Sequence, residues 1–514
     1  MKINNLTIIL TFFFISFILI INTGLHSDDY SALEISKRTS IQDFLSISIY
    51  SKGQTLFGIF NHFLFYWAYE FFSINHDYIY DYLKITINII SCLLFYCFSS
   101  TYLNRTNSLI FTLFFVFSPL HDSTTYWYMT TPYIFTACII LYCHYLIRND
   151  YIKIGFILLL FSSFLSYSSP PYIFGASLIF LIEKKYNKFI IFIIPGIIYV
   201  SLYLIYTYYF PQYENRINEN INLIFLFKNF ILQFFTSLDS LLGPSSLIKY
   251  ILSIYHNNII SFILGIIFIL FLLKIDFTNK INFSKSLFFG LLFILFLSLC
   301  MFSLTGLYFQ SPFNLGNRSL IYGSLFLSYL MVLICSYSKL RFLIIVFYIL
   351  SVFGLSQFWK DINKEQKIII ENISNNPFLE IDNNSTLFVE NNLYFELGLI
   401  SHVEFFTAPW VLESIFKSKN KNLFNLSALK KHIEIYDGYI LDVKTQKKIK
   451  LGNSIYLYDS STNKIKKISK KELLLIIDNK EIQIRHWVQL IRVDLLRDII
   501  INLSPRLEIY FYEN

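Results

Sequence analysis

The sequence predicts an α-helical polytopic membrane protein with a small C-terminal α+β domain. The chain has 514 residues and is 55% hydrophobic but only 15% charged, with a mean hydropathy of +0.52. A water-soluble domain needs a surface with about 25–35% charged residues. The apolar residues also form repeated runs long enough to cross a bilayer core of about 30 Å as helices. From about residue 360 onward, Asn, Lys, Glu and Asp become frequent.

The distribution of charge and cysteine excludes several classes of protein. The net charge is +8, and Lys and Arg gather in short breaks between the apolar runs, the pattern that orients a membrane protein. Basic patches with exposed aromatic residues are not visible, so we expect no nucleic-acid partner. All six cysteines fall within apolar runs, which argues against both a disulfide-stapled domain and a thiolate metal site on a loop.

The first apolar run, Leu6–Ile21, predicts an uncleaved membrane helix with a cytoplasmic N-terminus. The residues that follow it contain no small-x-small cleavage site. Residues 24–77 come next, and we expect amphipathic juxtamembrane helices on the outer face there. A second span in this segment is disfavoured because Glu70 would cost about 2.5–3.5 kcal/mol inside the membrane. A span would also place every later basic break outside.

The remaining runs predict ten further spans, which gives about 11 transmembrane helices and an extracytoplasmic C-terminus. The basic breaks near Arg105, Arg148, Lys184, Lys280 and Lys339 then all lie in the cytoplasm. Segment 221–242 stays open, since it is apolar yet contains charged residues, and it either spans the membrane or lies on it. The predicted spans are 78–101, 107–120, 131–147, 152–169, a short helix from 172, 189–210, 251–273, 286–307, 319–337 and 342–358.

The predicted domains are therefore 1–359, which crosses the membrane, and 360–514, an α+β domain on the outer face. Alternating apolar residues predict strands at 385–389, 432–436, 454–458 and 507–512. Residues 472–478 are expected to form a further strand, and 487–502 a helix.

An acidic doublet, Asp28-Asp29 in His26–Tyr30, follows the first helix directly. Carboxylates at a low-dielectric boundary can act as a general base toward an alcohol or bind a divalent cation through oxygen. The simpler alternative is a solvated pair that ends the helix. Two acids followed by a helix-like stretch weaken that alternative.

A first helix, an outer acidic doublet, juxtamembrane helices, many spans and a terminal outer domain resemble the GT-C class of glycosyltransferases. This class includes the protein mannosyltransferases and the lipid A aminoarabinose transferase. The resemblance implies an inverting transfer of sugar from a polyprenyl-phosphate-linked donor to a lipid or glycan acceptor at the outer face of a bacterial inner membrane, in polysaccharide biosynthesis of the cell envelope. It also implies that Asp28 or Asp29 activates the acceptor hydroxyl.

Other polar residues near the predicted outer ends are candidates for substrate binding. His121-Asp122 follows the span 107–120, and Arg318 begins the span 319–337, where a guanidinium suits bidentate recognition of a lipid phosphate. Lys249 and His256 flank the span 251–273 and could meet phosphate or metal. If a divalent cation takes part, its candidate ligands are Asp28, Asp29, Asp122 and His256.

Two other functions stay open on the sequence. An O-antigen or capsule polymerase also uses lipid-linked sugars, but its large polar loop usually lies between helices rather than at the end of the chain. A lipid-linked oligosaccharide flippase or transporter would require internal repeats and polar residues at the membrane midplane. The predicted spans are nearly free of charge.

Overall fold

The computed structural model describes residues 4–38, 78–209, 222–275, 283–306, 309–337 without 314, 340–379, and parts of the C-terminal region. Those parts are residues 384–390, 409–419, 425–429, 433–443, 447–479, 483–484, 493–503 and 512–513, with the single residues 40, 42 and 505. The second half of the predicted juxtamembrane segment, the loop at 210–221, the break around Lys280 and most of the predicted strand 507–512 lie outside these residues.

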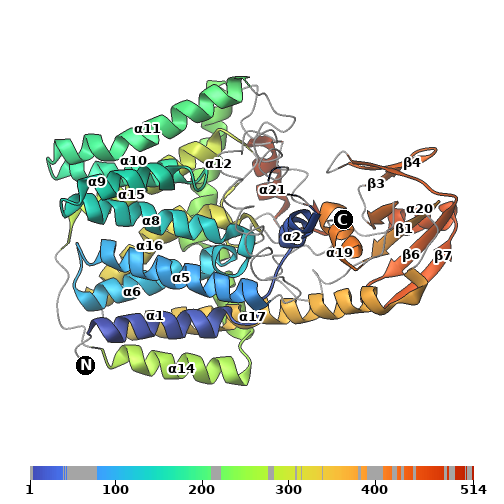
Figure 1. Cartoon of the computed structure of the whole chain (residues 1–514), viewed down its shortest axis with the longest axis horizontal. Helices are drawn as coiled ribbons and strands as arrows, with labels where there is room; N and C mark the ends of the chain where they lie inside the picture. Colours follow the sequence, from blue (N-terminus) through green and yellow to red (C-terminus); the bar gives the residue numbers. More distant parts are fainter. Residues whose placement is uncertain are drawn as a thin grey trace.

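The first two thirds of the chain form a bundle of helices, most of which run side by side (Figure 1). The bounds are α1 (Asn5–Ile20), α2 (Asp28–Arg38), α5 (Tyr78–Ser99), α6 (Arg105–Val116), η1 (Pro119–His121), α7 (Ser123–Tyr126), η2 (Tyr128–Thr130), α8 (Thr131–Arg148), α9 (Ile152–Ser163), α10 (Ser169–Ile182), α11 (Tyr186–Tyr209), α12 (Leu223–Leu242), α13 (Pro244–Tyr255), α14 (Ile259–Leu273), α15 (Lys285–Ser303), η3 (Leu315–Leu320), α16 (Ile321–Tyr337) and α17 (Arg341–Asn375).

The bundle confirms the predicted class of helical membrane protein. Among the described residues, six helices are long and apolar enough to cross a membrane, or seven if α12–α13 and α14 make one bent span. The shorter apolar helices α1, α9 and α10 accompany them. Each predicted span overlaps mainly one helix or, for 251–273, parts of two helices, but the number of 11 crossings is reached only if helices shorter than a full span are counted.

Two of the predicted spans have wrong bounds. The span 251–273 is interrupted at His256–Asn258, where α13 and α14 meet at an angle of 112°. The open segment 221–242 is helix α12, which belongs to the same bent unit. The span 342–358 is only the first half of α17, a helix of 35 residues. Its length is about 52 Å, which exceeds the thickness of a membrane.

Charged residues at the far end of the bundle, away from the C-terminal domain, form one connected group. Arg148 at the end of α8 contacts Glu183 at the end of α10 over 2.5 Å, and Ser286 of α15 donates to the same carboxylate at 3.0 Å. Lys188 of α11 pairs with Asp150 at 2.7 Å. Several of the predicted basic breaks therefore do share one end of the bundle, as the charge pattern requires.

The C-terminal part is a mixed α and β region, as predicted. Its elements are η4 (Pro377–Leu379), β1 (Ser385–Glu390), α19 (Pro409–Ser418), β2 (Leu426–Ala428), β3 (Ile433–Ile435), β4 (Tyr439–Asp442), β5 (Lys447–Lys450), β6 (Ser454–Asp459), β7 (Lys464–Ile468), α20 (Lys470–Asn479), β8 (Gln483–Ile484), α21 (Asp494–Leu503) and β9 (Tyr512–Glu513). The main sheet has the order β2-β1-β6-β7, with β1 parallel to both neighbours and β7 antiparallel to β6. The predicted strand at 472–478 is wrong, since this segment is helix α20.

Helix α17 joins the two parts, running out of the bundle to the strands (Figure 1). Its last turns contribute Ile369 and Ile373 to the core beneath the main sheet, where they pack with β1, α19 and β2. Helix α2 lies against α19 at the end of the bundle nearest the C-terminal domain. We call this end of the bundle the domain face.

Candidate functional site at the domain face

The turn after α1 brings the acidic doublet back toward the bundle. Asn22 and Gly24 both have φ of 67° and Ser27 has φ of 46°, so the chain turns sharply before α2. A Cβ on Gly24 would lie 1.9 Å from Oδ1 of Asn363 on α17, so only glycine fits. Asn363 also donates to the carbonyl of Asn22 at 2.9 Å. Helix α17 therefore helps to hold this turn.

Asp29 is fully buried and joins two segments of the chain. Its Oδ2 accepts the backbone N–H of His26 at 2.9 Å, and its Oδ1 accepts that of Met129 in η2 at the same distance. Burial raises the pKa of Asp29 to about 7, against the lowering effects of the two amides and of Lys84. Asp29 therefore changes charge near neutral pH, unlike an ordinary aspartate.

Asp28 lies at the partly exposed surface between α2 and α19. Its Oδ1 accepts the indole N–H of Trp410 at 2.7 Å, and the Trp410 side chain itself is 47% exposed. The two neighbouring acids thus have different surroundings. Asp28 is partly exposed, whereas Asp29 is covered.

His26 connects the doublet to α17. Its Nδ1 is 2.9 Å from Nε2 of Gln366, and its ring packs edge-on against Trp359 with centroids 4.7 Å apart. Its carbonyl accepts the indole N–H of Trp127 at 2.9 Å. Burial, with the nearby charge of Lys84, lowers the pKa of His26 well below its ordinary value, so the ring is neutral at pH 7.

Asp122 is the centre of a second buried polar group. Its carboxylate lies 3.2 Å from Nζ of Lys249 on α13 and accepts the indole N–H of Trp359 at 2.7 Å. Asn317 of η3 donates to the same carboxylate and accepts from Ser123. Both members of the ion pair are fully buried. Asp122 therefore links η1, α13, η3 and α17, and its contact with substrate stays a prediction.

His121 is bound within its own turn. Its Nδ1 lies 2.8 Å from Oγ1 of Thr124 and its Nε2 lies 2.9 Å from the carbonyl of Phe115. Burial lowers the pKa of His121 to about 4. Both ring nitrogens are in use, so the predicted contact of His121 with substrate would require these bonds to break.

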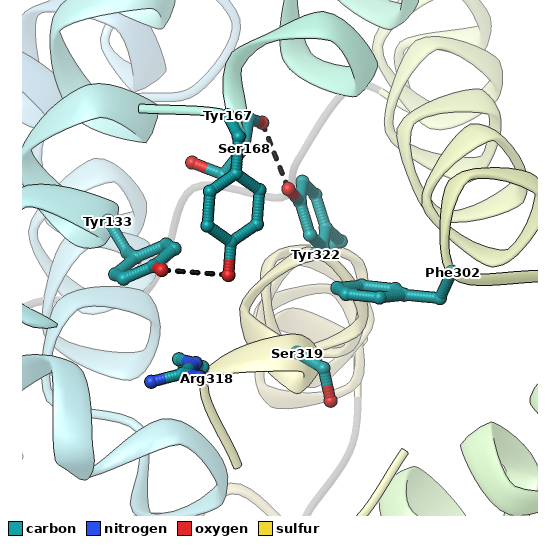
Figure 2. A pocket seen from close by; sticks show the side chains of 7 residues that line it. All are labelled: Tyr133, Tyr167, Ser168, Phe302, Arg318, Ser319 and Tyr322. Carbon is teal, nitrogen blue, oxygen red and sulfur yellow. Dashed lines mark hydrogen bonds between the residues drawn. The ribbon is translucent and has the colours of Figure 1, made fainter. Parts of the chain in front are cut away.

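Arg318 lines a pocket with aromatic walls at the start of α16 (Figure 2). Its guanidinium carbon is 5.9 Å from the ring centre of Trp127 and 5.8 Å from that of Tyr133. The hydroxyls of Tyr133 and Tyr167 are 2.7 Å apart, and Figure 2 shows this pair beside Arg318. The pocket is narrow, with a volume of about 10 Å³ for the centre of a water-sized molecule. The full lining is Tyr133, Tyr167, Ser168, Phe302, Arg318, Ser319 and Tyr322.

Side-chain contacts connect three of the predicted site residues in one cluster. Arg318 packs on Trp127, which binds the carbonyl of His26 three residues before Asp29. From the ring of His26, contact continues through Trp359 to Asp122. These contacts connect Arg318, the turn before Asp29, and Asp122 at the domain face. The pocket itself is lined by Arg318 and not by Asp28, Asp29 or Asp122.

The other two candidates lie beside this network. Lys249 is committed to Asp122 and also lies 5.6 Å from the ring centre of Phe313. His256 follows α13 and packs edge-on against Phe358 of α17, with centroids 5.1 Å apart. In the part of the chain that the structure describes, no group of three or more His, Cys, Asp or Glu could hold a metal ion, so the candidate ligands do not assemble a cation site there.

Sequence reasoning missed a buried ion pair in α5. Lys84 and Asp81 lie 3.0 Å apart, fully buried, in the first two turns of a helix otherwise interpreted as a plain apolar span. The spacing of three residues places both charges on one helix face, and this was the available signal. Gln366 and Trp410 were missed because they belong to segments assigned to a separate domain.

Comparisons with known proteins give little further identification. No protein-family profile matches the chain, and no curated protein matches it. Among solved structures, the chain is similar to the crystal structure of ArnT from Cupriavidus metallidurans bound to undecaprenyl phosphate. The match covers 93% of this chain and 95% of that one, with 10% sequence identity and a TM-score of 0.37. A match at this level transfers no property of that enzyme to this chain.

Proposed function

We propose that this chain is a membrane glycosyltransferase of GT-C type that uses a polyprenyl-phosphate-linked sugar as donor. The acceptor would be a lipid or glycan at the extracytoplasmic face of a bacterial inner membrane. The observation that carries this proposal is the acidic doublet at the end of α1, with Asp28 at the surface and Asp29 buried in contact with the same network as Arg318.

Asp28 is assigned the role of general base because it is the acid that a substrate can reach. It would take the proton of the acceptor hydroxyl as the new oxygen–carbon bond forms at the anomeric carbon. The bond from that carbon to the phosphate oxygen breaks on the opposite side, and the polyprenyl phosphate leaves with the electron pair. Attack opposite the leaving group inverts the anomeric configuration.

Arg318 is assigned to the donor phosphate. A guanidinium can stabilise the negative charge that develops on the departing phosphate, and the surrounding tyrosines offer hydroxyls to the same group. Lys249 is not available for this role while it neutralises Asp122. The polyprenyl chain would lie along the apolar surface of the bundle.

Reconstitution into proteoliposomes with a radiolabelled polyprenyl-phosphate sugar tests the proposal. Wild-type protein is expected to transfer label to an acceptor, and Asp28→Asn and Arg318→Gln are expected to abolish transfer without loss of folded protein. Asp150→Asn is the matched control, since this exposed acid lies at the opposite end of the bundle. Full activity in Asp28→Asn would refute the assignment of Asp28 as the base, and full activity in the double variant Asp28→Asn/Asp29→Asn would refute a catalytic role of the doublet. Movement of label across the membrane without transfer would instead support a flippase.

A further inference from the structure

The ion pair Lys84–Asp81 makes more contacts with the chain around the doublet than any helix-stabilising role requires. Nζ of Lys84 donates to Oγ1 of Thr23 at 2.7 Å, to the carbonyl of Gly24 at 2.6 Å and to the carbonyl of Tyr126 at 2.9 Å. The Lys84 side chain has no exposed surface. A buried ammonium surrounded by oxygens is fully satisfied, so it is costly to remove.

Asp81 binds the same turn from its other side. Its Oδ2 accepts the backbone N–H of Asn22 at 2.8 Å, and its Oδ1 accepts that of Gly24 at 2.9 Å. The pair thus uses both charges to fix the turn at Asn22 and Gly24, where Asn22 has the left-handed conformation that residues other than glycine rarely adopt.

The two segments that Lys84 holds are those that Asp29 joins. Lys84 binds Thr23 and Gly24 on one side, and Asp29 binds the amide of His26 on the same segment. Lys84 also binds the carbonyl of Tyr126, and Asp29 binds the amide of Met129 in the same short connection. We infer that Lys84, held by Asp81, is a positioning residue that fixes the backbone to which the catalytic doublet is attached.

The charge of Lys84 acts on the same group. It lowers the pKa of Asp29 and partly offsets the effect of burial, whereas the neighbouring Asp28 acts in the opposite direction. Among the described residues near Asp29, His26 is neutral at pH 7 because burial disfavours its charged form, and Tyr128 is neutral at this pH as any tyrosine is. Lys84 is therefore the cation that favours ionised Asp29.

This inference rests on the proposed function for its catalytic meaning, so its test needs one measurement that does not depend on activity. The variants are Lys84→Met, and the double variant Lys84→Met/Asp81→Asn, which leaves no unpaired buried charge if the single variant fails to fold. Lys360→Met is the matched control. That lysine is partly buried and also donates to a backbone carbonyl, that of Ile18 at 2.8 Å, and among the described residues its hydrogen bond does not go to the turn at 22–24.

Hydrogen exchange of the amides of residues 22–30 and 126–130 gives the independent measurement. Both Lys84 variants are expected to exchange faster in these two segments, and Lys360→Met is not. In the transfer assay, the double variant is expected to lose about 100-fold in kcat with little change in the KM of the donor. The fall in the Tm of the double variant with rising pH is expected to extend to a higher pH than in the wild type, because ionised Asp29 has lost its nearby cation.

The outcomes separate the two proposals. Unchanged exchange in both segments, or an unchanged kcat in the folded double variant, would overturn the positioning role of Lys84. If the wild type transfers no sugar, the proposed function is refuted. Faster exchange in the Lys84 variants would then still support the role of Lys84 in holding the doublet.

Discussion

Asp29 and Asp122 are both buried carboxylates at the domain face, and they are stabilised in opposite ways. Asp122 has a lysine in direct contact and accepts hydrogen bonds from three side chains on separate elements. Asp29 accepts from two backbone amides, and burial raises its pKa to about 7. Asp122 is paired directly with a lysine, whereas burial sets Asp29 to gain or lose a proton near neutrality. The comparison separates an acid used for assembly from one suited to respond to its surroundings.

The largest expected effect is on stability at the Asp122 centre. Asp122→Ala leaves Lys249 buried without its partner, which should cost about 3–5 kcal/mol of stability and lower the Tm strongly. Thermal unfolding in detergent, followed by tryptophan fluorescence, measures this loss. Asp150→Ala, which removes an exposed partner of Lys188, serves as the control and should be nearly neutral. A small loss in Asp122→Ala would show that the two centres do not differ as described.

The pH dependence of stability should come from Asp29. Its pKa is about 7 in the folded protein and 3.8 in the unfolded chain, so the unfolded chain ionises first as pH rises. Stability therefore decreases between about pH 4 and pH 7, by on the order of 4 kcal/mol, and this contribution is constant above that range. The Tm of wild type and of Asp29→Asn, measured across this range, gives the contribution by difference. Parallel curves for the two proteins would contradict it.

Gly24→Ala should disturb the Asp29 centre and leave the Asp122 centre intact. The new Cβ would meet Asn363 and would require a left-handed conformation, which costs about 1–3 kcal/mol for a residue other than glycine. Lower Tm and reduced transfer are expected. The double variant Gly24→Ala/Asn363→Ala removes the steric contact but keeps the backbone strain, so it should recover only part of the loss. Complete recovery would show that the backbone conformation is unimportant.

The smallest effect is expected from substitution of Trp410, the hydrogen-bond partner of Asp28. Trp410→Phe keeps an aromatic ring but removes the N–H that binds the Asp28 carboxylate, so kcat/KM should fall by about three- to tenfold with no change in Tm. Trp410→His retains a ring N–H and should restore part of the activity. Kinetic constants for both variants provide the test. A loss equal to that of Asp28→Asn would mean that Trp410 does more than orient the acid.

The membrane class and the position of the doublet could be predicted because both depend on local sequence. Long apolar runs and an acidic pair at their end need no knowledge of distant contacts. The role of Asp122 could not be predicted in this way, since its partner Lys249 is 127 residues away and the pairing depends on how the helices pack. The same holds for Trp410, which reaches Asp28 across 382 residues.

Other errors had a local signal that was overlooked. The run Leu473–Ile477 suggests a strand, but Ser469 and Glu472 form a reciprocal capping box that starts helix α20. The polar triplet His256–Asn258 marks the break between α13 and α14, where Asn258 caps the second helix. Composition placed a domain boundary at about 360, but the backbone hydrogen bonds continue through it to Asn375. The change from apolar to polar composition near residue 360 therefore does not end the helix.

Helix α17 makes contacts all along its course from the helix bundle to the C-terminal sheet. Successive turns place Ser356 on the end of α1, Trp359 on Asp122, Asn363 on the turn at Asn22, Gln366 on His26, and Ile369 in the core of the C-terminal domain. These contacts recur every three or four residues and so occupy one face. One residue inserted after Gln366 would rotate everything beyond it by about 100° and move Trp410 away from Asp28. The number of residues in this part of α17 therefore sets the direction in which each contacting side chain points. Insertions or deletions that keep these contacts aligned are those that add or remove about one full turn.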